Sequence, residues 1–285
     1  MTDVLLIADR RRKGVPEAIE EVRRIITPHG RIVEELEADL RPIPPRTIFD
    51  LVVVLGGDGT LIAQCRRLLD RGVPMVGLNF GRLGFLAEFD LDSLRQHATM
   101  IFGHDAIVRN RMVLDAIVRN ARGDLVHEGL AINEAAVTAG TPFRMIELKI
   151  SFGRDQGPDL LGDGVIVATP IGSTAYNVSA GGPIVQPDLE AMIVTPICAH
   201  SLAFRPIVTA SHLDIMMEVM RANDGSALVL DGQAIVPLSA GDRVLVGRHH
   251  TAAKFIGNPD RTYWDTLADT MRWAAAPSYR RPNSP

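Results

Sequence analysis

The first hundred or so residues alternate short apolar runs with helical patterns. Continuous apolar runs at residues 4–8, 51–55 and 75–78 indicate strands that are buried on both faces. Apolar positions recur at helical spacing over residues 16–26, and a second helix is expected from about residue 60 to 69. Because strands that alternate with helices form a parallel sheet covered on both faces, we expect an α/β, Rossmann-like domain over residues 1–104.

From about residue 106 the pattern changes to a period of two residues, with mostly apolar positions alternating with more polar ones. Apolar and polar positions alternate over residues 108–116, 146–152 and 212–219, and turn residues at 120–124 and 223–225 predict hairpins. An all-β sandwich is therefore expected over residues 105–256. Residues 257–285 carry a short helical pattern, with Trp264, Leu267 and Met271, and then a tail rich in Pro and Ser. We expect this helix and tail to pack back on the N-terminal domain, with the last residues disordered.

Composition argues against a nucleic-acid-binding, a disulfide-stabilised and a membrane-spanning protein. With 46% hydrophobic residues the chain can bury a large core, and a net charge of −4 gives no basic surplus for nucleic acid. The basic cluster at residues 10–13 is expected to be a solvated loop, and a phosphate-attracting role is the alternative. Cys65 and Cys198 predict no disulfide and are expected to be small core residues in a reducing compartment. No apolar run is long enough to span a bilayer, so we expect a cytoplasmic protein with no membrane or nucleic-acid partner.

Gly56-Gly57-Asp58-Gly59 follows the strongest predicted strand and opens a helix. Ligands of open α/β sheets bind at the carboxyl ends of the strands, where glycines let the backbone approach a phosphate and free N–H groups favour an anion. A carboxylate at this place can hold a cation or remove a hydroxyl proton. From these residues alone, an ordinary tight turn with Asp58 as a helix N-cap is equally compatible.

Further segments carry a family resemblance. The run from Gly56 to Thr60 resembles the signature shared by NAD kinases and diacylglycerol or sphingosine kinases, and no Gly-Lys-Ser/Thr of a nucleotide P-loop follows it. The segments that resemble NAD kinases in particular, in that family's order, are residues 79–86, 133–134, 162–176, 179–183, 200–208 and 231–233. The match over residues 163–183 is highly specific, whereas the Asp-Gly-Gln triplet at 231–233 alone would mean nothing.

This resemblance implies an enzyme that phosphorylates the 2′-hydroxyl of the adenosine ribose of NAD to give NADP. It implies ATP as donor, with other nucleoside triphosphates or polyphosphate as alternatives. It also implies a divalent cation, Mg²⁺, without a dedicated protein ligand cluster, and a homodimer or homotetramer. Asp58 is the implied catalytic proton acceptor. The implied donor-phosphate residues are Gly56, Gly57, Gly59 and Thr60, and the implied substrate-binding residues are Gly59, Phe85, Asn133, Glu134, Arg144, Asp163, Thr174, Ala175, Tyr176, Asn177, Val178, Ser179 and Gln233.

Simpler structural roles remain open for several of these residues. Asn133 and Glu134 could form a strand-end turn, Ser173 and Thr174 could cap a helix, and Phe85 alone would more often be a core residue. His200 and Arg205 stand in an apolar stretch and are expected to make structural hydrogen bonds.

One position departs from the family pattern. Many members carry Arg or Lys where this chain has Leu161, so a donor contact could be absent here. Alternatively, Leu161 lies on the buried face of a strand.

Two other functions compete with the NAD kinase prediction. A lipid kinase could share the Gly-Gly-Asp-Gly turn, but it would need an exposed apolar surface for its substrate. A non-catalytic NAD(P)-binding sensor is the alternative from another class, and the retention of Asp58 argues against it.

Overall fold

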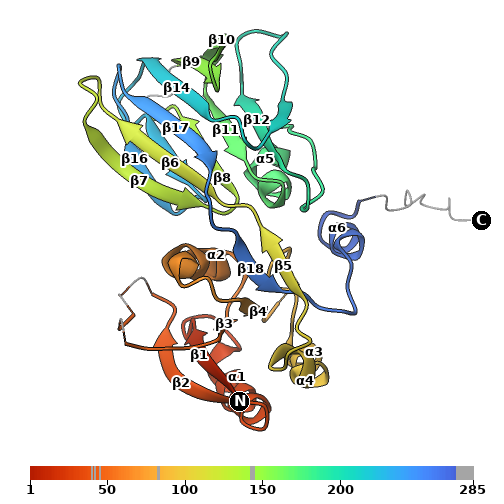
Figure 1. Cartoon of the computed structure of the whole chain (residues 1–285). Coiled ribbons are helices and arrows are strands. Elements are labelled where there is room, and N and C mark those ends of the chain that lie inside the picture. The colour runs from red at the N-terminus through yellow and green to blue at the C-terminus, as the bar shows by residue number, and fades with distance from the viewer. Residues whose placement is uncertain (40, 42, 45, 82–83, 142–144, 274–285) are drawn as a thin grey trace, which may run out of the picture. The chain divides into compact units, whose positions relative to one another are not determined.

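The chain folds into two compact units (Figure 1). The structure is a computed structural model that describes residues 1–39, 41, 43–44, 46–81, 84–141 and 145–273. Unit 1 comprises Met1–Leu61, Val73–Arg109 and the chain from Phe255 onward, and unit 2 comprises Ile62–Gly72 and Asn110–Lys254. The Pro- and Ser-rich end of the chain lies outside the described residues.

Unit 1 is built on a six-stranded sheet in the order β2-β1-β3-β4-β18-β5, in which β2, β1, β3, β4 and β18 pair in parallel. Its strands are β1 (Thr2–Ala8), β2 (Gly30–Glu37), β3 (Leu51–Leu55), β4 (Met75–Leu78), β5 (Val108–Arg111) and β18 (Ala253–Ile256). The helices along this part of the chain are α1 (Val15–Ile26), α2 (Asp58–Leu68), η1 (Leu69–Arg71), α3 (Leu91–Gln96), α4 (Ala98–Ile101) and α6 (Tyr263–Met271).

Helices cover both faces of this sheet. The even-numbered residues of β1 share one buried cluster with α1, α3 and α4. Leu61 of α2 lies directly over Gly77 of β4, whose neighbours Val76 and Leu78 belong to the first cluster, so α2 covers the opposite face. The predicted α/β domain is therefore confirmed. It has the doubly wound arrangement, and the chain runs outward in opposite directions from β1 and β3.

Unit 2 contains two six-stranded sheets, in the orders β10-β9-β14-β17-β6-β7 and β13-β12-β11-β8-β15-β16, and their adjacent strands pair antiparallel. Their inward residues, such as Val118 of β6 and Val137 of β8, form one buried cluster, which confirms the predicted all-β sandwich. The strands are β6 (Leu114–Arg119), β7 (Leu125–Ala131), β8 (Glu134–Thr138), β9 (Ile146–Phe152), β10 (Asp155–Gly162), β11 (Gly164–Ala168), β12 (Ala191–Ile197), β13 (Ile207–Ala210), β14 (Ile215–Arg221), β15 (Ala227–Leu230), β16 (Ala234–Pro237) and β17 (Arg243–Arg248), and η2 (Ile171–Thr174) and α5 (Tyr176–Ser179) follow β11.

Two predicted details of the β region are wrong. The alternating run at residues 108–116 is not one strand, because β5 joins the sheet of unit 1 while β6 joins the sandwich. The turn at residues 223–225 connects β14 to β15, which lie in different sheets, so it is not a hairpin. Alternation and turn residues indicate the local backbone geometry, but they do not determine which other strand each strand pairs with. The hairpin at residues 120–124 is confirmed, with Asn120 N–H donating to Asp124 O at 3.0 Å.

The two cysteines differ in exposure. Cys65 is buried, and desolvation raises the pKa of its thiol to about 12. Cys198 is exposed and has a φ of 45°, so the prediction that both are core residues is wrong for Cys198. Its apolar neighbours in the sequence belong to β12, which ends one residue earlier.

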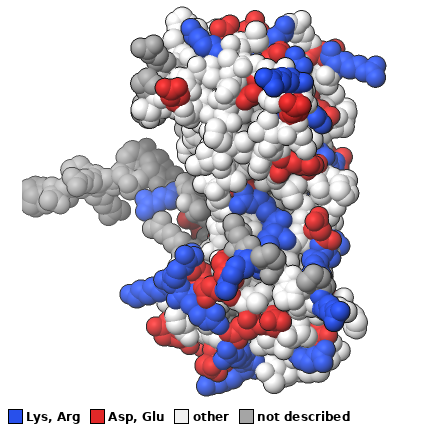
Figure 2. Space-filling model, turned by 90° about the vertical axis from the view of Figure 1, so that its left-hand side faces the viewer, with Lys and Arg blue, Asp and Glu red and all other residues white. Residues whose placement is uncertain are grey.

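Charged side chains of both signs are mixed on the surface. On the face drawn in Figure 2, Lys and Arg side chains lie among Asp and Glu side chains, in keeping with the net charge of −4. Among the described helices, none is both long and apolar enough to cross a membrane.

Candidate functional site

In unit 1, the Gly-Gly-Asp-Gly turn lies at the carboxyl end of β3, and α2 begins at Asp58. The Asp58 carboxylate accepts hydrogen bonds from the backbone amides of Phe85 at 2.8 Å, Leu86 at 3.3 Å and Ala87 at 2.8 Å. A Cβ on Gly84 would collide with this carboxylate, so the chain can pass there only as glycine. Asp58 is thus the first residue of the helix, and a distant segment holds its side chain in one orientation.

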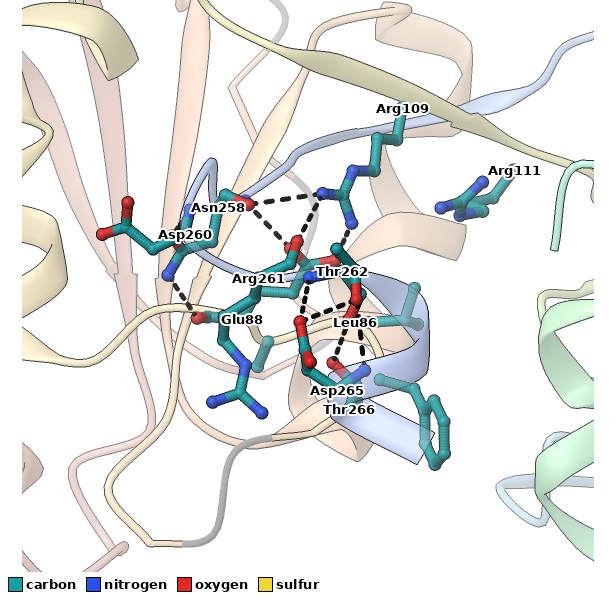
Figure 3. Close-up of polar contacts among 12 residues, drawn as sticks. Leu86, Glu88, Arg109, Arg111, Asn258, Asp260, Arg261, Thr262, Asp265 and Thr266 are labelled. Atoms are coloured by element: carbon teal, nitrogen blue, oxygen red, sulfur yellow. Dashed lines mark hydrogen bonds and ion pairs between the residues drawn. The ribbon is translucent and has the colours of Figure 1, made fainter. Parts of the chain in front are cut away.

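An ion pair between Glu88 and the half-buried Arg109 fixes the end of that segment (Figure 3). Glu88, which is 8% exposed, accepts hydrogen bonds from Arg109 at 2.7 Å and from the backbone N–H of Asn258 at 2.9 Å. The side-chain amide of Asn258 in turn donates to the Glu88 carbonyl at 3.1 Å. Glu88 directly follows the amides that hold Asp58. The sequence analysis missed it, although an acidic residue inside the apolar run Leu86-Ala87-Glu88-Phe89 was a signal.

Phe85 also contributes a ring to unit 1. It is half-buried, and its ring centroid lies 6.4 Å from that of Tyr263 at the start of α6. The helical pattern predicted for the C-terminal region is confirmed as α6, which Thr262 and Asp265 cap at its start. Within α6, Leu267 is buried whereas Trp264 is 55% exposed.

In unit 2, Asp231 organises the Asn-Glu pair. Its side chain is fully buried and accepts hydrogen bonds from the backbone amides of Ile132 at 3.0 Å, Asn133 at 2.7 Å and Glu134 at 3.1 Å. Arg66 lies 3.5 Å from the same carboxylate. Although the Asp-Gly-Gln triplet is uninformative as sequence, its Asp231 holds the backbone of the Asn133–Glu134 segment.

Glu134 begins β8 and is 6% exposed. Burial, and then the charge of Asp231, raise the pKa of Glu134 to about 7, whereas the Tyr176 backbone amide acts in the opposite direction. Within the described part of the chain, one carboxylate oxygen of Glu134 has no hydrogen-bond partner. A buried acceptor without a partner is costly, so this oxygen is suited to a ligand donor.

The segment after β11 packs on the same pair. The Thr169 hydroxyl donates to Ile132 O at 2.7 Å, and a Cβ on Gly172 would collide with Asn133 O. The predicted helix start is present as the short η2 and α5, but neither has a side-chain cap. The Ser173 hydroxyl instead bonds the backbone of Val185, so capping does not explain this residue.

Tyr176 is the first residue of α5, and it is 42% exposed. Burial, and then the charges of Cys198, Glu134 and Asp163, raise the pKa of Tyr176. Of the predicted neighbours, Thr174, Ala175 and Val178 are half-buried and Ser179 is exposed. Asn177 differs, because its fully buried amide bonds Ser173 O, Pro183 O and the Thr195 hydroxyl.

Other predicted positions are less central. The Gln233 carbonyl oxygen accepts from Arg66 at 2.5 Å, and Arg144 lies outside the described residues. Leu161 is half-buried on β10, and its backbone carbonyl accepts from the amide of His200 at 2.8 Å. Where the structure describes the chain, no group of His, Cys, Asp and Glu side chains could hold a metal ion.

Comparison with known proteins decides between the competing functions. Residues 132–257 match the model of the ATP-NAD kinase C-terminal domain, and residues 29–106 match that of the N-terminal domain. The chain belongs to the ATP-NAD kinase family. Membership confirms the predicted enzyme class, a kinase that phosphorylates NAD with ATP, over the lipid kinase alternative.

The curated relatives cover most of the chain. It is 40% identical over 223 residues to the NAD kinase of Desulforamulus reducens. This match covers 78% of this chain and 77% of the relative. It is 35% identical over 275 residues to the NAD kinase of Heliobacterium modesticaldum. This match covers 90% of this chain and 95% of the relative.

Two solved structures share the fold. The chain is similar to a crystal structure of yeast NADH kinase complexed with NADH, with a TM-score of 0.84 and 22% identity. This match covers 99% of this chain and 90% of the other chain. At that identity, the likeness supports the fold alone. It is also similar to an NAD kinase from Archaeoglobus fulgidus in complex with ATP, with a TM-score of 0.74 and 25% identity. This match covers 94% of this chain and 98% of the other chain.

Proposed function

We propose that this family member transfers the γ-phosphoryl group of ATP to the 2′-hydroxyl of the adenosine ribose of NAD, with Asp58 as the proton acceptor. The ribose oxygen forms the new bond to phosphorus, the bond to ADP breaks, and the hydroxyl proton passes to the Asp58 carboxylate. The observation that carries this proposal is the fixed carboxylate at the carboxyl end of β3, held by the amides of residues 85–87.

The geometry of Asp58 suits a base. A carboxylate has about four lone-pair positions, and the amides of residues 85–87 use three of them. The remaining position can accept a hydroxyl proton without disturbing the others. Gly56, Gly57, Gly59 and Thr60 lie around the start of α2, where the positive end of the helix dipole favours the donor phosphates.

We propose Mg²⁺ as the divalent cation, carried mainly by the phosphate oxygens of ATP. The described residues offer no ligand cluster, and Mg²⁺ in kinases is commonly bound through substrate phosphates with few carboxylates. When bound, such an ion offsets the negative charge of the donor phosphates. Asp58 itself stays oriented by the backbone amides.

In unit 2, the NAD contacts are proposed to come from Asn133, Glu134, Asp163 and Tyr176, with Thr174, Ala175, Val178, Ser179 and Gln233 as further contacts. Amide and carboxylate groups bind ribose hydroxyls and amide groups, and the exposed ring of Tyr176 offers a surface for a flat ring. Asn177 is proposed to shape the segment, because its side-chain amide is already used.

The assay that tests this function measures NADP formation from NAD, ATP and Mg²⁺, with inorganic polyphosphate and other nucleoside triphosphates as alternative donors. A chain that binds NAD but forms no NADP with any donor would be a sensor instead. From the family resemblance we also propose a homodimer or homotetramer, which sedimentation equilibrium would test. From the sequence pattern we propose a cytoplasmic location.

Replacing Asn133 or Tyr176 by Ala is expected to weaken NAD binding about tenfold and to leave ATP binding nearly unchanged. The reason is that both residues are among the proposed NAD contacts in unit 2, and a lost hydrogen bond or ring contact is worth about 1 kcal/mol or more. Calorimetry with each ligand separately makes the measurement. Asn110→Ala, at an exposed position, is the matched control. Unchanged NAD affinity in both variants would remove these residues from the dinucleotide contacts.

NAD affinity is expected to rise several-fold between about pH 6 and about pH 8. Glu134 has a raised pKa of about 7, so the fraction of charged carboxylate grows over this interval. A ribose hydroxyl donates a stronger hydrogen bond to the charged form than to the neutral acid. Calorimetric titrations across this range should show the rise in the wild type and a flat profile in Glu134→Gln. A flat profile in the wild type would contradict the contact.

A further inference from the structure

The loops that follow β1 and β3 are next to each other at the carboxyl edge of the unit 1 sheet. The strand order is β2-β1-β3-β4, so the chain leaves β1 and β3 toward opposite sides of the sheet. Such a switch point opens a crevice outside the strand ends, which is where ligands of doubly wound sheets bind. The loop at residues 9–14 follows β1, and the Gly-Gly-Asp-Gly turn follows β3.

Arg12 reaches from the first loop across this edge. Its Nη2 donates to the side-chain oxygen of Asn79, which follows β4, at 3.0 Å. A Cβ on Gly57 would collide with Nη1, and one on Gly81 would lie 3.8 Å from Nη2. The guanidinium of Arg12 therefore lies against the glycine turn and against the segment after β4. It is half-buried rather than solvated.

The charge of Arg12 is balanced differently from that of its neighbours in the loop. Arg10 pairs with Glu35 and Glu37, and Arg11, whose side chain is 83% exposed, pairs with Asp9. Arg12 contacts the neutral amide of Asn79, and within the described ranges it makes no ion pair. The half-buried guanidinium of Arg12 lies next to the Gly-Gly-Asp-Gly turn and has further N–H donors besides the one that bonds Asn79. Such a planar group can bind two phosphate oxygens at once.

We infer that Arg12 binds the phosphates of the donor ATP and that Asn79 orients its guanidinium. This inference rests on the proposed function and adds a residue to it. Of the two roles expected for the basic cluster, the phosphate-attracting one then applies to Arg12, and the solvated loop describes Arg11. Gly57 then has a second reason to be glycine, because its missing side chain leaves room for the guanidinium as well as for the phosphates.

The test compares Arg12→Gln with Arg11→Gln, the same change one residue away on an exposed, ion-paired side chain. Arg12→Gln is expected to raise the KM for ATP and the calorimetric Kd of ATP about 10- to 100-fold, the size expected for a lost hydrogen bond to a charged group. The Kd of inorganic tripolyphosphate should rise in parallel, because the contact is to phosphate. The Kd of NAD should stay within about twofold, and Arg11→Gln should leave all these values unchanged.

Two results would overturn the inference. One is an unchanged ATP affinity in Arg12→Gln. The other is an equal loss of ATP and NAD affinity together with a lower melting temperature, because Arg12 would then only tie the loop to Asn79. Arg12→Lys separates charge from geometry, and its ATP affinity should lie between those of the wild type and Arg12→Gln. A wild-type chain that forms no NADP would contradict the proposed function, yet the binding measurements would still test Arg12.

Discussion

Asp58→Asn is expected to lower kcat by roughly a hundred- to ten-thousand-fold, the usual cost of removing a general base, while NAD still binds. Asparagine has nearly the same shape but cannot accept a proton from the ribose hydroxyl at neutral pH. The NAD contacts proposed in unit 2 are untouched by this change. Steady-state kinetics together with calorimetric NAD binding measures both quantities. Asp70→Asn, the same substitution at an exposed residue of η1, is the matched control.

The structure adds a second effect that must be separated from the loss of the base. Asparagine offers one acceptor oxygen, and its NH₂ group would face a backbone N–H of the segment that holds Asp58. Part of the lost activity could therefore come from a displaced segment at residues 84–87. Glu88→Gln weakens the ion pair with Arg109 that fixes the same segment and leaves Asp58 in place. If Glu88→Gln lowers kcat as much as Asp58→Asn does, displacement of the segment accounts for the loss in Asp58→Asn, and that loss no longer supports Asp58 as the base.

The parts of the fold that could be predicted are those that a local pattern determines. A run such as that of β3, apolar at every position, fits a strand covered on both faces, and it has no polar face to expose. The Gly-Gly-Asp-Gly turn was recognisable because glycines after such a strand are needed for close backbone approach. The turn alone left a simple N-cap role for Asp58 equally open, and the resemblance to NAD kinases made it the candidate catalytic residue.

The residues that position the candidate site could not be predicted, because they act through contacts between distant parts of the chain. Asp231 holds amides that are 97 to 99 residues away, and Glu88 bonds Asn258 across 170 residues. No periodicity relates such positions in one sequence. The same holds for β5, whose alternation gave its strand character but not its sheet. Arg12 was indistinguishable from Arg10 and Arg11 until the fold separated their partners.

Asp231→Ala is expected to destabilise the protein by roughly 3–5 kcal/mol, since it removes one partner of a buried ion pair and leaves Arg66 unpaired. Alanine would also be strained at the φ of 50° that Asp231 adopts. Asp231→Asn avoids this strain, because asparagine tolerates that conformation. The Asn variant should cost about 1–3 kcal/mol, because one oxygen must replace two as acceptor for the backbone amides. Thermal or urea unfolding measures both losses, and Asp224→Asn in an exposed turn is the control.

We propose that Asp231 positions Asn133 and Glu134 for NAD binding. A residue that only stabilised the fold would not be expected to change the pKa of Glu134. The charge of Asp231 is one of the causes that raise the pKa of Glu134. Removing that charge in Asp231→Asn should lower the pKa of Glu134, so the pH at which NAD affinity rises should move downward from about 7. NAD affinity should also fall at every pH, because the backbone of Asn133 and Glu134 is held less firmly. Calorimetric profiles of the wild type and Asp231→Asn make the comparison. A profile that keeps its midpoint, in a variant that is only less stable, would show that Asp231 supports the fold without tuning Glu134.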